Sequence, residues 1–157
     1  AAEIAYRYLA DNHVPCLLYQ GRYNLFNREP EEEGILDQAS EHDSGFVAFS
    51  PLAQGLLTGR YLDGIPEDSR IARGGHLKKE ALTEDVLRKI RDLNEIAARR
   101  GQTLAEMSLA WLLKDEKVTS VIIGASSVKQ IDDNLKSLDN TSFCDEEICL
   151  INNVLSR

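Results

Sequence analysis

Three short, nearly continuous apolar runs divide the chain: VPCLLYQ at residues 14–20, FVAFS at 46–50 and VTSVIIG at 118–124. Runs of this length without polar alternation are typical of strands that are covered on both faces, as in parallel sheets. Segments with helical periodicity separate them, so the order is helix, strand, helix, strand, two helices, strand, helix, helix. This alternation predicts an α/β fold.

Capping residues mark the helices between the second and third runs. Thr83 precedes a helix with acids in its first turn, and Gly101 follows its basic end, so both termini are complemented. Thr103 and Glu106 have the spacing of a capping box that opens the next helix, in which Trp111 is expected to be a core residue. The stripe predicted to be buried on the first of these helices is Val86, Ile90, Leu93 and Ala97.

Two more helices are predicted towards the end of the sequence. Ser127 and Gln130 have capping-box spacing at the start of the first one. The second begins near Asp145. The inward-facing residues are predicted to be Ile131, Leu135 and Leu138 on the first helix, and Ile148, Ile151 and Leu155 on the second.

Composition limits the classes of partner. The chain has a formal net charge of −8 at pH 7, whereas a surface that binds nucleic acid needs clustered Lys and Arg. No apolar run approaches the roughly 20 residues needed to span a bilayer, and the sequence does not start like a signal peptide. Its 3 Cys and 3 His are too scattered for a disulfide framework or a metal site. We therefore expect one domain in a cytoplasmic protein, without nucleic-acid or membrane partners and without a metal.

Two loops after predicted strands are candidates for binding phosphate. The first, SPLAQGLLTGR, runs from Ser50 to Arg60 and contains glycines that let a ligand approach the backbone. The second, residues 124–127, opens a helix, and helix N-termini attract anions. Ligands of parallel sheets lie at the carboxyl ends of the strands, so both loops would face one ligand. The residues alone leave open a plain turn with a surface arginine at the first loop and simple helix capping at the second.

Four blocks have a familiar order and spacing: QGRYNLFNRE, AFSPLAQGLLTGRYLDGIPEDSR, LNEIAARRGQTLAEMSLAWLLKD and VTSVIIGASSVKQIDDNL. They closely resemble aldo-keto reductases, in particular the branch of bacterial L-glyceraldehyde 3-phosphate reductase and the potassium-channel beta subunits. The resemblance implies a (β/α)8 TIM barrel. Residues 1–157 would be its C-terminal part, with about strands 6 to 8 and their helices.

The resemblance also implies a cofactor, NADP, and positions that bind it. Gln20 matches the glutamine that hydrogen-bonds the nicotinamide carboxamide, and Phe49 matches the aromatic ring stacked on the nicotinamide. Arg60 and Arg70 match basic positions near the phosphates. The loop over the pyrophosphate is matched by Ser50, Pro51, Leu52, Ala53, Gln54 and Gly55, and the segment that grips the 2′-phosphate and adenine by Gly124, Ser126, Gln130, Asp133 and Asn134.

The match departs from the family pattern in places. Arg60 stands where many relatives have Lys, which is not interchangeable with Arg at a bidentate site. Asp133 stands where Glu is common, and Gly21 replaces bulkier residues found beside the nicotinamide. The family's catalytic Asp, Tyr, Lys and His have no counterpart in this chain, and Tyr23 is interpreted as structural.

These matches predict a parent protein that reduces small aldehydes, such as L-glyceraldehyde 3-phosphate, by hydride transfer from NADPH. This chain would supply the cofactor site and be inactive alone, and the full-length protein could form homo-oligomers. A second hypothesis is a cofactor-sensing interaction subunit like the channel beta subunits. A third is a complete small α/β domain that binds a phosphate ligand.

Overall fold

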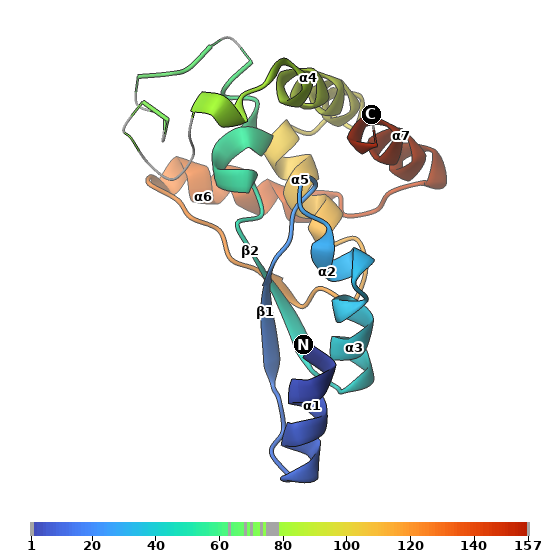
Figure 1. Cartoon of the computed structure of the whole chain (residues 1–157). Helices are drawn as coiled ribbons and strands as arrows, with labels where there is room; N and C mark the ends of the chain where they lie inside the picture. Colours follow the sequence, from blue (N-terminus) through green and yellow to red (C-terminus); the bar gives the residue numbers. More distant parts are fainter. Residues whose placement is uncertain are drawn as a thin grey trace.

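A computed structural model describes residues 2–62, 64–67, 69, 71–72, 74 and 79–156 of the chain (Figure 1). The elements confirm the predicted α/β alternation. Arg70, which is predicted to lie near the cofactor phosphates, is outside the described residues. The order is α1 (Ala2–Asp11), β1 (Leu18–Arg22), α2 (Glu29–Glu32), α3 (Ile35–Glu41), β2 (Gly45–Phe49), η1 (Ala53–Thr58), η2 (Lys79–Ala81), α4 (Glu84–Arg99), α5 (Leu104–Leu112), β3 (Ser120–Val121), α6 (Val128–Leu135), η3 (Lys136–Asp139) and α7 (Asp145–Leu155).

The three strands form one parallel sheet in the order β1-β2-β3, as the apolar runs predict. The predicted strand limits are wrong at both outer strands. β1 begins at Leu18 rather than at residue 14, because its partner β2 begins at Gly45, which pairs with Leu18. β3 has only two residues, which pair with Val47 and Ala48 of β2.

Only one face of this sheet is covered by the described part of the chain. Phe46 and Ala48 of β2 are fully buried in the main hydrophobic core. Side chains alternate between the faces of a strand, so Val47 and Phe49 point to the other face. On that open face Leu18 of β1 is 58% exposed. The described part of the chain therefore covers β1 and β2 on one face, not on both faces as predicted.

The helices after β2 have the predicted ends. Thr83 Oγ1 accepts a hydrogen bond from the Val86 amide at the start of α4, and Gly101 has φ 69° just beyond its end. Thr103 and Glu106 form the capping box of α5, and Trp111 is 1% exposed. Residues buried on the facing helices α4 and α7 are Ile90, Leu93, Ile96, Ala97, Ile151 and Val154, whereas Val86, Ile148 and Leu155 are partly buried.

The stripe predicted to be buried on α6 is exposed. Ile131 is 44% exposed, Leu135 54% and Leu138 58%. Leu138 also lies in the 3-10 helix η3, because α6 ends at Leu135. Periodicity identifies this helix correctly but not the surface that would cover it. Among the described residues, no helix is both long and apolar enough to cross a membrane.

Candidate cofactor site

The loop that follows β2 has an unusual backbone. Three non-glycine residues adopt left-handed φ angles: Ser50 at 53°, Ala53 at 46° and Gln54 at 59°. Gly55 follows at 102°. Such conformations cost about 1–3 kcal/mol each outside glycine and gather at ligand sites and switches. The strain lies at the carboxyl end of the central strand, where parallel sheets bind ligands.

Hydrogen bonds and core packing hold this loop. The Ser50 carbonyl accepts hydrogen bonds from Asn24 Nδ2 at 2.9 Å and from the Ala53 amide at 3.0 Å. The Thr58 hydroxyl donates to the Gly55 carbonyl at 2.7 Å. Leu57 anchors the segment in the core with no exposed surface. Of the remaining predicted loop residues, Pro51 is buried and Leu52 is half-buried, and Arg60 is exposed at the end of the loop.

The two residues predicted to contact the nicotinamide share one face of the sheet. Gln20 in β1 pairs with Val47, and Phe49 at the end of β2 pairs with Arg22. Residues paired in a parallel sheet point to the same side, so Gln20 and Phe49 both belong to the open face. Gln20 is exposed and Phe49 is half-buried.

The start of α6 carries the second group of predicted residues. Ser127 Oγ accepts a hydrogen bond from the Gln130 amide at 3.3 Å. Gln130 Oε1 accepts from the amide of Ser126 at 2.7 Å and from its hydroxyl at 3.2 Å. The predicted capping box is therefore half right, since the Gln130 side chain reaches Ser126 instead of Ser127. Gly124 lies exposed before this turn and Asn134 is half-buried within the helix.

Asp133 of α6 is held by two lysines, one in α6 and one at the start of η3. Its carboxylate accepts from Lys129 Nζ at 2.6 Å and from Lys136 Nζ at 2.8 Å. These hydrogen bonds lower the pKa of Asp133 below its usual value. The carboxylate predicted to lie near the adenine is thus engaged in ion pairs with Lys129 of α6 and Lys136 of η3.

Residues 1–156 match the Aldo/keto reductase family. The chain belongs to this family. This confirms the family recognised from the four sequence blocks, and the relatives below confirm the branch.

Among the relatives, two L-glyceraldehyde 3-phosphate reductases, from Escherichia coli O157:H7 and K12, are 50% and 49% identical over 142 residues. The alignments cover 88% of this chain and 41% of each relative. A probable voltage-gated potassium channel subunit beta from Arabidopsis thaliana is 41% identical over 129 residues, which cover 80% of this chain and 39% of the relative. The chain thus spans about two fifths of the length of these relatives.

The fold agrees with the family assignment. The structure matches a thermostable aldo-keto reductase, crystallised with the inhibitor epalrestat, with a TM-score of 0.66 and 24% identity. The match covers 94% of this chain and 43% of the other chain. At this level of identity the likeness concerns the fold, which in aldo-keto reductases is a (β/α)8 barrel.

The chemistry of the two segments fits the anionic dinucleotide that aldo-keto reductases use. The loop after β2 has positive φ at Ser50, Ala53, Gln54 and Gly55, a backbone conformation that gathers at ligand sites. The first turn of α6 holds no acidic residue and includes Lys129, so the positive end of the helix dipole is not cancelled there. One rearrangement is required, because a phosphate at the Ser126 amide must displace the Gln130 carbonyl oxygen that now accepts from it.

Tyr23 has the structural role predicted for it. The residue is 1% exposed, and its hydroxyl donates to Glu31 Oε2 at 3.0 Å. Its ring lies edge-on to Phe46 and tilted against Trp111. Burial and then the neighbouring Glu31 carboxylate raise the pKa of Tyr23 far above its usual range. The hydroxyl is consequently a fixed hydrogen-bond donor within the aldo-keto reductase core.

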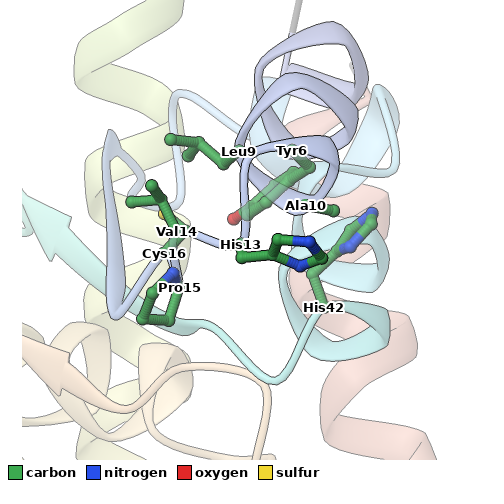
Figure 2. Close-up of a pocket in the computed structure, with 8 residues that line it drawn as sticks. All are labelled: Tyr6, Leu9, Ala10, His13, Val14, Pro15, Cys16 and His42. Carbon is green, nitrogen blue, oxygen red and sulfur yellow. The ribbon is translucent and has the colours of Figure 1, made fainter.

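A hollow of about 320 Å³ lies near the amino end of β1, beside α1 and away from the predicted cofactor residues (Figure 2). The rings of Tyr6 and His42 stack there with centroids 4.5 Å apart. Over the described ranges, no group of three or more His, Cys, Asp and Glu is arranged to hold a metal ion. The hollow is lined by Tyr6, Leu9, Ala10, His13, Val14, Pro15, Cys16 and His42, none of which is a predicted cofactor residue.

Proposed function

We propose that this chain is the NADP(H)-binding C-terminal portion of an aldo-keto reductase that reduces small aldehydes by hydride transfer. The observation that carries the proposal is the left-handed backbone at Ser50, Ala53 and Gln54, in the segment expected to cover the pyrophosphate. The substrate class rests on the two relatives named L-glyceraldehyde 3-phosphate reductase.

The residues of this chain would bind and orient the cofactor, which supplies the hydride when bound. The Gln20 amide would hydrogen-bond the nicotinamide carboxamide, while the Phe49 ring would stack on the nicotinamide and select the face that meets the substrate. Arg60 and Arg70 would balance the phosphate charge. The pyrophosphate would lie on residues 50–55, and the adenosine 2′-phosphate and adenine on Gly124, Ser126, Gln130, Asp133 and Asn134.

The proton for the carbonyl oxygen would come from outside this chain. Tyr23 is buried and hydrogen-bonded to Glu31, so it is not available as a general acid. We propose that the family's Asp, Tyr, Lys and His belong to earlier strands of a longer polypeptide. The 157-residue chain alone is then expected to be inactive.

The test is an assay of the full-length polypeptide with L-glyceraldehyde 3-phosphate and NADPH. The loss of NADPH absorbance measures the rate of turnover. We expect NADPH-dependent turnover by the full-length polypeptide and none by the isolated chain. A full-length polypeptide that binds neither NADPH nor NADH contradicts the proposal. Turnover by the isolated chain contradicts the assignment of the proton donor.

A second candidate function is that of a cofactor-sensing interaction subunit. It is favoured by the 41% identity to the plant proteins named probable voltage-gated potassium channel subunit beta. Co-purification of the full-length polypeptide with an integral membrane channel, together with tight NADPH binding and very slow aldehyde turnover, would support it. Fast turnover without such a partner would exclude it.

A further inference from the structure

Asn24, in the turn after β1, is buried and hydrogen-bonded through both its side chain and its backbone. It is 3% exposed, and its Oδ1 accepts hydrogen bonds from the amides of Phe26 at 3.0 Å and Asn27 at 2.9 Å. Its backbone exchanges two hydrogen bonds with Asn27, both of 3.0 Å. The side chain therefore has a fixed direction, and its Nδ2 donates to the Ser50 carbonyl at 2.9 Å.

The Ser50 carbonyl is the group that this hydrogen bond fixes. The peptide between Ser50 and Pro51 has no N–H, so its carbonyl oxygen is its only hydrogen-bonding group. That oxygen accepts from Asn24 and from the Ala53 amide, which uses both of its lone pairs. Ser50 itself has a φ of 53°, which an L-residue adopts only when its surroundings enforce it.

The same turn also holds the preceding peptide. The Tyr23 amide donates to the Phe49 carbonyl at 3.4 Å. Two successive carbonyls at the carboxyl end of β2, those of Phe49 and Ser50, are therefore fixed by two successive residues after β1, Tyr23 and Asn24. In this way Asn24 connects the carboxyl end of β1 to the first left-handed residue of the loop after β2.

We propose that Asn24 is a positioning residue for the NADP(H) loop: its amide group fixes the Ser50 carbonyl and so holds the loop backbone in the conformation that accepts the pyrophosphate. The inference rests on the proposed function and deepens it. Asn24 itself does not contact the cofactor. Its effect is to prevent the loop from relaxing to an unstrained conformation when no cofactor is bound.

The substitution Asn24→Asp separates this role from the role of Asn24 in its own turn. Aspartate keeps an oxygen that accepts from the Phe26 and Asn27 amides, but it removes the donor to Ser50. Its second carboxylate oxygen would then face the Ser50 carbonyl oxygen, and the two acceptors repel each other. We expect the dissociation constant for NADPH of the full-length polypeptide to rise about tenfold, as for a lost buried hydrogen bond. Amide hydrogen exchange in residues 50–58 should also accelerate in the cofactor-free protein.

Asn12→Asp, at an exposed asparagine, is the control for the change in charge and in bond type. Asn12 Nδ2 donates to the Tyr8 carbonyl at 2.7 Å, beyond the end of α1 and at the opposite end of β1. The Asn12→Asp protein loses the same type of hydrogen bond and gains the same charge as the Asn24→Asp protein. We expect its NADPH affinity and its amide hydrogen exchange in residues 50–58 to match those of the wild type. If Asn24→Asp does not fold, Asn24→Ser serves instead, because the hydroxyl still accepts within the turn but is too short to reach Ser50.

The outcomes separate the inference from the function on which it rests. If Asn24→Asp lowers the melting temperature but leaves the NADPH affinity of the folded protein and the exchange of residues 50–58 unchanged, Asn24 is only structural and the inference is overturned. A wild-type full-length polypeptide that does not bind NADPH overturns the proposed function, and the inference with it. Weaker binding with faster local exchange in Asn24→Asp alone supports both.

Discussion

Gly21 shows that a residue next to a predicted cofactor contact can serve packing instead. Sequence comparison relates it to the fit beside the nicotinamide, but it pairs with Ala48 on the covered face of the sheet. A methyl group at Gly21 would lie 2.8 Å from Cζ of Phe46, which is fully buried. We expect Gly21→Ala to destabilise the full-length polypeptide by about 1–3 kcal/mol through overpacking, measured by urea unfolding.

The cofactor affinity of the folded Gly21→Ala protein should equal that of the wild type. As a control, Phe46→Leu removes the ring atoms that the methyl group would meet. In the double variant the penalty of Gly21→Ala should therefore shrink, which a double-mutant cycle measures. A loss of NADPH affinity without a loss of stability would instead relate Gly21 to the cofactor.

The short helix α2 is joined to α7 by a cluster around Arg28. Its guanidinium donates to both carboxylate oxygens of Glu31, at 2.8 and 2.6 Å, and to Asn152 Oδ1 at 2.5 Å. Partial burial raises the pKa of Glu31, but the hydrogen bonds from Arg28 and Tyr23 lower it more, so it lies below its usual 4.5. The stabilisation is therefore present above the unfolded-state pKa and is lost as the pH falls through the lower folded-state pKa.

Glu31→Gln should remove this stabilisation. We expect a loss of about 1 kcal/mol near neutral pH, a modest value because the pair is partly exposed and screened by water. The difference from the wild type should vanish in acid, where the wild-type carboxyl is protonated as well. Urea unfolding at several pH values measures both results. Glu32→Gln, at an exposed neighbour, is the control and should change stability little; an acid-independent loss in Glu31→Gln would contradict the assignment.

Elements whose limits depend on local chemistry could be predicted from the sequence, and those that depend on distant partners could not. The caps at Thr83 and Thr103 are formed by residues three positions apart, so both helices begin where predicted. The limits of β1 and the exposure of α6 depend on what pairs with or covers them. The left-handed φ of Ser50 had no sequence signal, since no glycine marks it, and the bond from Asn24 spans 26 positions.

The helices α1 and α3 lie along one side of strands β1 and β2, and the outer strands β1 and β3 each pair only with β2 among the described residues (Figure 1). Unpaired strand edges invite association with another chain. Large apolar side chains are exposed near the same edges. They are Ile4, Tyr8, Val14, Leu17 and Leu18 around α1 and β1, and Ile122, Val128, Ile131, Leu135 and Leu138 around β3, α6 and η3.

We expect the isolated 157-residue chain to bind anilinonaphthalene sulfonate and to self-associate, because many large apolar side chains are exposed on elements next to unpaired strand edges. Leu17→Asp combined with Ile131→Lys should reduce self-association of the isolated chain, measured by light scattering. The same two substitutions should lower the stability of the full-length polypeptide, where we propose that further parts of the barrel cover these positions. The pair should thus make the isolated chain more soluble and the full-length polypeptide less stable. An isolated wild-type chain that stays monomeric, excludes the dye and melts cooperatively would instead indicate a complete small α/β domain, whose exposed edges need no cover.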